Sequence, residues 1–302
     1  MSRTAPPDLT GQVVVVTGAN AGIGLETAVA LAELGATLVM TARTRSKGEA
    51  ALAEVRRRSG NQHVVLGDLD LSSFASIRDF ASWFLDRYER LDVLVNNAGL
   101  IVDTRRETAE GFEEMIGVNH LGHFLLTGLL QDRLVSSAPS RVVVVSSIAH
   151  RFALGGLNRS DLQSTYGFQG FAAYAQSKLA NLLFANELAR RLAGTGVTVN
   201  SVHPGSIRSH FGGDGDTGAL GWFIKRLGWL VMRSPKAGAR TSVKLASSRD
   251  PRVADASGTY WSHGRRWLAS RRARSEDEAR WLWDESERLV AAATNAPAEQ
   301  GS

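Results

Sequence analysis

Tyr174 and Lys178 are four positions apart in a segment with helical periodicity, residues 171–183. At about 3.6 residues per turn, their side chains project from the same face of a helix. An ordinary tyrosine has a pKa of about 10 and gives up its proton reluctantly at neutral pH. A nearby ammonium group favours the phenolate, so we expect Lys178 to lower the pKa of Tyr174. Such a pair is suited to general acid–base chemistry on a substrate oxygen.

Two further polar residues are expected beside this pair. Ser147 stands at the end of the predicted strand Val142–Ser146, and Asn119 lies on the predicted helix before that strand. Because parallel strands end at one edge of a sheet, these side chains would meet there. Ser147 would hydrogen-bond a substrate oxygen and stabilise charge forming on it, and Asn119 would hold a water that connects Lys178 with solvent. The set predicts reduction of a carbonyl by hydride; four polar residues satisfied separately in caps and turns are the alternative.

A glycine-rich turn follows the first apolar run of the chain. Val13–Thr17 has the composition of a buried strand and leads into Gly18-Ala-Asn-Ala-Gly22-Ile-Gly24, after which a helical pattern begins. In this arrangement the backbone amides and the dipole of the helix meet a pyrophosphate. A purely structural turn is the alternative. The residues expected to contact a dinucleotide are Gly18, Asn20, Gly22, Ile23 and Gly24.

The residues after the second predicted strand, Thr37–Ala42, indicate which dinucleotide binds. A site for NAD(H) usually presents a carboxylate to the ribose 2′-hydroxyl there, but the next acid in this chain is Glu49. The guanidinium of Arg43 can instead make paired hydrogen bonds to a 2′-phosphate. We therefore predict a preference for NADP(H), with NAD(H) also accepted. The alternative is that Arg43 simply starts the next helix.

Short motifs follow the next two predicted strands. Asp70 is expected to accept a hydrogen bond from the adenine amine, with Leu71 lining the same site. The small residues of Asn96-Asn-Ala-Gly99 would let the cofactor lie against the edge of the sheet, with contacts from Asn97, Ala98 and Gly99. Alone, either motif is an ordinary turn sequence.

Composition excludes several other classes of protein. The chain has 302 residues, of which 43% are hydrophobic and 22% charged, values typical of a globular protein. The absence of cysteine excludes disulfides, a thiolate nucleophile and cysteine-ligated metals. No metal is expected at the histidines either, because no carboxylate lies at ligand spacing from His120, His123, His150 or His203. The net charge of +5 is modest, and the arginines of 265–274 are followed at once by acids, so no nucleic-acid partner is expected.

No segment of the sequence predicts a membrane anchor. The first residues have no apolar core of the length that a signal peptide needs, and Leu220–Met232 is shorter than the roughly 20 residues of a spanning helix. A cytoplasmic protein is therefore expected. Loose membrane contact through Leu220–Met232 or the basic C-terminal region stays open, as does a homodimer.

Strand-length apolar runs alternate with helical patterns, which predicts a single α/β domain with a doubly wound parallel sheet and helices on both faces. An aromatic-rich substrate lid is expected near residues 206–234, and frayed termini over about 1–10 and 293–302. The predicted strands are Val13–Thr17, Thr37–Ala42, His63–Leu66, Val93–Val95, Val142–Ser146, Val197–Val202 and Thr259–Trp261. The predicted helices are Ile23–Leu34, Lys47–Arg58, Ser73–Arg87, Phe112–Leu134, Ala172–Leu192, Ala237–Ser247 and Glu276–Ala292.

From about Gly11 to Ser209 the chain resembles a short-chain dehydrogenase/reductase. The motifs that carry the resemblance stand in family order: Thr17-Gly-Ala-Asn-Ala-Gly-Ile-Gly24, Asn96-Asn-Ala-Gly99, Ser147, Tyr174-Ala-Gln-Ser-Lys178 and Pro204-Gly205. The resemblance implies a Rossmann-type fold with Tyr174 as the acid/base, Ser147 and Lys178 as its partners and Asn119 as a fourth member. The expected cofactor contacts here are Tyr174 and Lys178, whose ammonium group can hold the nicotinamide ribose, and, by the resemblance, Pro204, Gly205, Ile207 and Ser209. Ser209 stands where the family more often has threonine, which keeps the hydroxyl.

Within the family the chain resembles the retinol dehydrogenase-like and protochlorophyllide reductase-like branch, on motifs such as Ile116-Gly-Val-Asn-His-Leu-Gly-His-Phe-Leu-Leu-Thr127 and Ser201-Val-His-Pro-Gly205. This implies NADP(H), in agreement with the argument from Arg43. We expect an oxidoreductase that interconverts a carbonyl and an alcohol on a bulky apolar substrate. The alternatives are a reductase of C=C bonds and a non-catalytic nucleotide-sensing protein on the same fold.

Overall fold

The computed structural model describes residues 7–205 and 234–295, which form one α/β unit around a sheet of eight strands. The order across the sheet is β3-β2-β1-β4-β5-β6-β7-β8. All neighbours pair in parallel except β7 and β8, which are antiparallel. The strands are β1 (Val13–Val16), β2 (Thr37–Ala42), β3 (Val64–Asp68), β4 (Val93–Asn96), β5 (Ser140–Val145), β6 (Val197–His203), β7 (Thr259–Ser262) and β8 (Arg265–Arg266).

The central strands are continuous apolar runs because both faces of the sheet are covered. Successive side chains of a strand point to opposite faces, so each run supplies two separate cores. In β1, Val15 belongs to one core while Val14 and Val16 belong to the other. In β5, Val142 and Val144 alternate with their neighbours in the same way.

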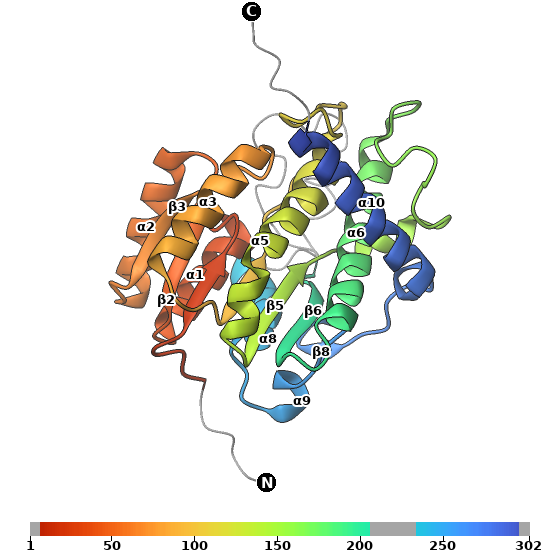
Figure 1. Ribbon diagram of the computed structural model, residues 1–302. Coiled ribbons are helices and arrows are strands. Elements are labelled where there is room, and N and C mark those ends of the chain that lie inside the picture. The colour runs from red at the N-terminus through yellow and green to blue at the C-terminus, as the bar shows by residue number, and fades with distance from the viewer. Residues whose placement is uncertain (1–6, 206–233, 296–302) are drawn as a thin grey trace, which may run out of the picture.

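Helices cover the two faces of the sheet as separate layers. In Figure 1, α3, α5, α6 and α10 lie on the viewer's side of the strands, and α8 lies behind them and packs against α1. The helices are α1 (Gly22–Glu33), α2 (Arg45–Ser59), α3 (Phe74–Arg87), α4 (Glu114–Ile116), α5 (Gly122–Ser136), α6 (Gly170–Arg191), α8 (Pro235–Ser247), α9 (Pro251–Ala254) and α10 (Glu276–Asn295). Shorter turns are the π-helix η1 (Gly117–Leu121) and the 3-10 helices η2 (Ile148–Phe152) and η4 (Arg272–Arg274).

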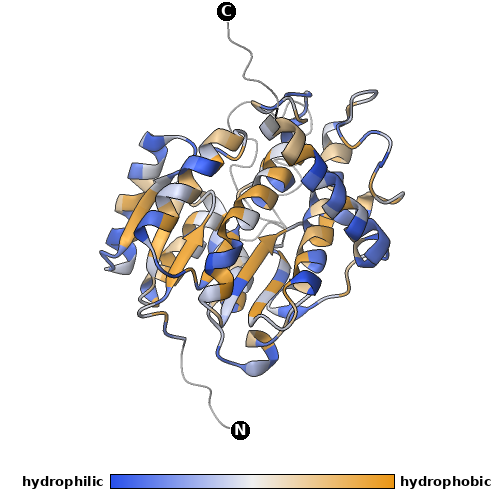
Figure 2. Cartoon of the chain, in the orientation of Figure 1, coloured by the Kyte–Doolittle hydropathy of each residue, from blue (hydrophilic) through white to orange (hydrophobic). Residues whose placement is uncertain are grey.

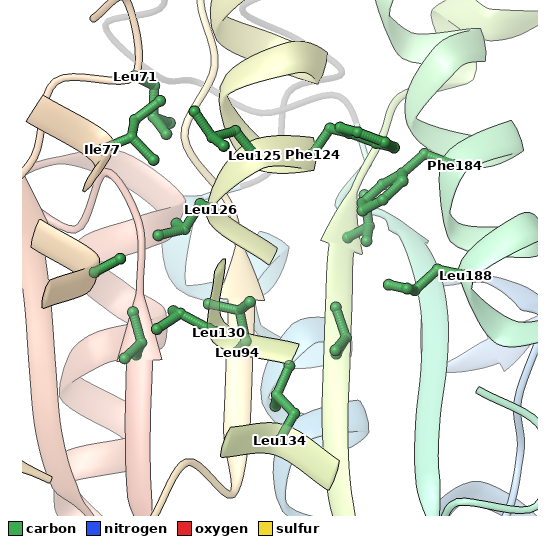
Figure 3. Close-up of a cluster of buried hydrophobic side chains, with 14 of the residues drawn as sticks. Leu71, Ile77, Leu94, Phe124, Leu125, Leu126, Leu130, Leu134, Phe184 and Leu188 are labelled. Atoms are coloured by element: carbon green, nitrogen blue, oxygen red, sulfur yellow. The ribbon is translucent and has the colours of Figure 1, made fainter. Parts of the chain in front are cut away.

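The largest core lies under α3, α5 and α6. Leu126 and Leu130 from α5 meet Leu94 from the sheet, and Phe124 meets Phe184 from α6 at 5.7 Å between ring centroids (Figure 3). The hydropathy colours of Figure 2 show orange strands enclosed by helices with blue residues on their outer surfaces. This packing fixes α6 against the sheet, and α6 carries Tyr174 and Lys178.

Most predicted elements are confirmed, and the exceptions have physical causes. The predicted helix Phe112–Leu134 is confirmed with shifted ends: α4, η1 and α5 run without a gap from residue 114 to 136. The helix begins at Glu114 because the Glu113 carboxylate caps the Met115 and Ile116 amides, and η1 is a π-helical turn within it around Asn119. Strand β8 was not predicted. It follows a turn in which His263 and Gly264 have positive φ, and its two arginines carry no apolar pattern.

The ends of the described chain are held further out than the sequence predicts. Leu9 is 2% exposed within the expected frayed segment 1–10, and its amide donates to the Leu34 carbonyl at 2.8 Å. Helix α10 continues to Asn295, beyond the expected end at Ala292. Leu9 and residues 293–295 are therefore part of the folded structure and not of the frayed termini that the sequence had predicted. Of the lid expected near residues 206–234, residues 206–233 lie outside the described residues.

None of the helices that the structure describes is long and apolar enough to span a bilayer.

Candidate active site

Two buried hydrogen bonds fasten α6 to the carboxyl end of β5. The Ser146 hydroxyl donates to the Lys178 carbonyl at 2.7 Å, and the Asn181 amide donates to the Val145 carbonyl at 3.1 Å. These bonds set Tyr174, one turn earlier on α6, beside Ser147 at the end of the strand, and the two side chains are hydrogen-bonded. The structure therefore brings Tyr174 and Ser147 together at the carboxyl end of β5, where the sequence predicted that they would meet.

Ser147 is held in place by hydrogen bonds to both its hydroxyl and its backbone carbonyl. It caps η2, and its hydroxyl accepts from the Ala149 amide at 3.2 Å. Its carbonyl lies 2.6 Å from Nδ1 of His150, while Nε2 of His150 accepts from the Ser270 amide. A carbonyl only accepts, so Nδ1 carries the proton and His150 is neutral; burial lowers its pKa accordingly. His150 thus orients the serine.

Burial dominates the protonation of Tyr174 and Lys178. Desolvation raises the pKa of Tyr174 to about 12, and the hydrogen bond with Ser147 acts in the opposite direction. Lys178 is 2% exposed, and desolvation lowers its pKa to about 8. The expectation that Lys178 lowers the pKa of Tyr174 is therefore not confirmed, because the cost of charging a group away from water is the largest effect and the hydrogen bond with Ser147 is the one that opposes it. The lysine Nζ lies 5.6 Å from the centre of the tyrosine ring.

The side-chain amide of Asn119 is committed to protein partners. Its Oδ1 accepts from the Leu100 amide at 2.8 Å, and its Nδ2 donates to the Leu100 carbonyl and to the Ser177 hydroxyl, each at 3.0 Å. Asn119 therefore ties the chain after β4 to α6. The expected water between Asn119 and Lys178 stays a prediction.

The glycine turn is tied to the chain after β4. The Thr17 hydroxyl accepts from the Asn97 and Ala98 amides at 2.9 and 3.0 Å, and the Asn97 side chain donates to the Thr17 carbonyl at 2.8 Å. Gly18 has a φ of +62°, and a Cβ there would lie 2.8 Å from the Cβ of Ala98. A Cβ on Gly24 would overlap the Gly18 carbonyl. Only glycine permits this approach.

The start of α1 fits a phosphate group. It has no side-chain cap and no acid in its first turn, so its first amides point outward without a partner from a capping side chain. Gly22 and Ile23 stand at this end, and Asn20 lies just before it. Lys178 fits a polar ligand as well, since its buried Nζ makes no hydrogen bond with another described residue.

Arg43 and Asp70 stand after the carboxyl ends of β2 and β3. The Ala19 amide donates to the Thr41 carbonyl at 2.9 Å, which places the glycine turn beside the end of β2. Arg43 follows this strand, is exposed, and has no hydrogen bond or ion pair with a described residue. One carboxylate oxygen of Asp70 accepts from the Ser72 amide and hydroxyl, at 2.9 and 2.6 Å. Leu71 is buried in the core.

The remaining expected contacts are only partly described. Pro204 and Gly205 follow β6, and Gly205 has a φ of +92°. Ile207 and Ser209 lie outside the described residues. Across residues 7–205 and 234–295 no group of three or more His, Asp or Glu side chains could hold a metal ion.

Sequence reasoning missed the residues that hold the site together. Ser146, Asn181, His150 and Thr17 all act through bonds to distant parts of the chain, and nothing in their spacing indicates this.

Comparisons with known proteins agree with this geometry. The short chain dehydrogenase family model matches residues 12–216. Human retinol dehydrogenase 11 is 46% identical over 286 residues, covering 94% of this chain and 87% of that protein. Human retinol dehydrogenase 13 is 44% identical over 284 residues, covering 93% and 85%.

Solved structures of other proteins have a similar fold. A crystal structure of an uncharacterised protein from Mycobacterium paratuberculosis has a TM-score of 0.74 and 36% identity, covering 94% of this chain and 95% of that one. The NADP active-site complex of Pseudomonas aeruginosa RhlG has a TM-score of 0.66 and 28% identity, covering 85% and 97%. The fold, the matched family model and these relatives together show that the chain belongs to the short-chain dehydrogenase/reductase family of oxidoreductases and is similar to retinol dehydrogenases.

Proposed function

We propose that the protein is an NADP(H)-dependent oxidoreductase that interconverts a carbonyl and an alcohol on a bulky apolar substrate. The main support is the convergence of Ser147, Tyr174 and Lys178 where β5 meets α6. The glycine turn reaches the same place through Ala98 and Gly99, since a Cβ on Gly99 would lie 3.1 Å from the lysine Nζ.

A bound nicotinamide supplies the hydride in reduction and accepts it in oxidation. Tyr174 donates its phenolic proton to the oxygen that becomes the alcohol, and takes it back in the reverse direction. With its pKa raised to about 12, the phenol of Tyr174 carries at neutral pH the proton that it donates in reduction. The Ser147 hydroxyl hydrogen-bonds the same oxygen as charge forms there. Lys178 would offer its N–H groups to a ribose hydroxyl of the cofactor, and the first turn of α1 and Arg43 would hold its phosphates.

Apolar side chains near Tyr174 support the apolar substrate. Phe171, three residues before Tyr174, meets Phe152 of η2 at 5.3 Å between ring centroids. The two rings are 41% and 62% exposed, so apolar surface borders the predicted site. The similarity to retinol dehydrogenases, whose names give a large apolar alcohol as their substrate, points the same way.

The test is an initial-rate survey with NADPH and NADH, separately. Its substrates are aldehydes and ketones graded from short and polar to long-chain, aromatic and polyene, with matched enones in which C=C reduction is scored by product analysis. We expect turnover of C=O with NADPH, rising with apolar size. Products reduced only at C=C would replace the proposal by a double-bond reductase. Cofactor binding without turnover across the survey would favour a nucleotide sensor.

A further inference from the structure

His123 joins two parts of the site that the catalytic residues do not join. It lies at the start of α5 and is 2% exposed. Its Nδ1 is 3.2 Å from the Asn119 carbonyl, and its Nε2 is 2.9 Å from the Thr17 hydroxyl. One imidazole therefore bridges the helix that carries Asn119 and the strand end that begins the glycine turn.

The partners fix the protonation of the ring. The Asn119 carbonyl can only accept, so Nδ1 carries a proton and donates it. Burial lowers the pKa of His123 to about 4, and the charge of Lys178 acts in the same direction, so the ring is neutral and Nε2 is an acceptor. The hydroxyl proton of Thr17 then points to Nε2 at 2.9 Å, which is closer than its other acceptor, the Val95 carbonyl, at 3.4 Å. Both lone pairs of that hydroxyl face the Asn97 and Ala98 amides.

These bonds bear on the position of Lys178. The chain continues from Ala98 to Gly99, which packs against both Asn119 and the lysine Nζ. His123 is thus connected to both residues that enclose the ammonium group. Through Thr17 and Ala98 it is connected to Gly99, and through its Nδ1 it is bonded to Asn119. The lysine itself has no hydrogen bond to a described residue that would hold it there.

We propose that His123 is a positioning residue: its doubly hydrogen-bonded imidazole sets the glycine turn and the Asn97–Gly99 segment at the distance from Asn119 that the dinucleotide requires. The inference rests on the proposed function and names a determinant of cofactor affinity in the same site. His123 neither touches the reacting atoms nor titrates during turnover.

His120 provides a matched control. It lies three residues earlier, is fully buried, and its pKa is lowered to about 3 by burial. Its Nε2 is 2.8 Å from the Ser286 hydroxyl of α10, which itself donates to the Leu282 carbonyl. His120 thus makes a buried hydrogen bond of the same kind, but to α10 and not to the glycine turn. Its replacement by alanine therefore measures the loss of stability caused by removing any buried histidine.

The experiment measures NADPH binding by fluorescence in the wild type and in His123→Ala, His123→Gln, His123→Asn and His120→Ala, with thermal unfolding to show that each is folded. We expect His123→Ala to weaken binding about tenfold, the effect of losing one to two hydrogen bonds. A Gln oxygen can accept from Thr17, whereas the shorter Asn amide reaches only toward Asn119. His123→Gln should therefore recover affinity and His123→Asn should not. His120→Ala should lower the melting temperature with affinity kept within about twofold.

Two results would overturn the inference: NADPH affinity in the three His123 variants within about twofold of wild type, or an equal loss of affinity in His120→Ala. If His123→Ala does not fold, the contrast between the Gln and Asn variants decides in the same way. A wild type that binds neither NADPH nor NADH would instead contradict the proposed function, and the inference with it.

Discussion

Gly99 packs directly against Lys178: a Cβ on this glycine would lie 3.1 Å from the lysine Nζ and equally 3.1 Å from Oδ1 of Asn119. That separation is tighter than an ordinary van der Waals contact. The glycine is therefore needed for space and not for backbone freedom, because a larger residue would press on the buried ammonium group.

Replacement of Gly99 by alanine should damage the site with little effect on the fold. The added methyl group pushes on Lys178 and Asn119, at the cost of about 1–3 kcal/mol typical of overpacking, so we expect at least about tenfold weaker NADPH binding or turnover. Gly128→Ala is the control, because Gly128 is an exposed position of α5 with open space around it. That change should raise stability by about 0.5–1 kcal/mol and leave kinetics alone. Equal kinetics in the two variants would contradict the packing argument.

Arg43 should set the preference between the two dinucleotides. Arg43→Ala is expected to weaken NADPH by about 10- to 100-fold, the worth of hydrogen bonds between charged groups, and to leave NADH nearly unchanged. Arg45 is the control: it is similarly exposed, but bonds Asp68 at 2.6 Å and Glu49 at 3.0 Å. The ratio of kcat/KM values for NADPH and NADH is the measurement. An unchanged ratio in Arg43→Ala, or the same change in Arg45→Ala, would rule out this role.

Burial of Lys178 should lower the free energy of unfolding at neutral pH. Burial lowers its pKa from 10.5 to about 8, so between these pH values the unfolded chain keeps a proton that the folded chain has released. The free energy of unfolding therefore rises with pH across this window, by up to about 3 kcal/mol. Lys178→Met should be more stable than wild type at pH 7, and the difference should shrink toward pH 10.

Denaturant unfolding of both proteins from pH 7 to pH 10 tests this. The raised pKa of Tyr174 makes stability fall as tyrosines of the unfolded chain ionise near pH 10, but both proteins contain Tyr174, so this effect cancels in their difference. A difference between the two proteins that does not vary with pH would show that the lysine is not desolvated as described.

The fold was largely readable from the sequence because its strands are buried on both faces. A strand such as Thr37–Ala42 is a continuous apolar run bounded by turn residues, and its observed bounds are those predicted. The π-helix at Asn119 was not readable, because it adds a residue to one turn inside an uninterrupted apolar periodicity. Strand β8 was missed because two exposed arginines pair through backbone groups alone.

The residues of the site could be predicted from the sequence, but their protonation and the bonds that hold them could not. Ser147 and the glycine turn both follow parallel strands, whose carboxyl ends lie at one edge of the sheet. The order of the motifs along the chain was therefore enough to predict that they lie close together. The protonation of Tyr174 depends on burial, which spacing does not reveal. The bridge from Thr17 to His123 joins positions 106 residues apart, and only the packing of α5 on the sheet brings them together.

The most direct test of the account is Tyr174→Phe, which removes only the phenolic oxygen. With the best carbonyl substrate and NADPH, kcat should fall by about 10²- to 10⁴-fold, the range for loss of a general acid, while the Kd of NADPH stays unchanged. Tyr166→Phe is the control, since Tyr166 is 91% exposed, and it should turn over like the wild type. Wild-type turnover in Tyr174→Phe would contradict the assignment of Tyr174 as the proton donor.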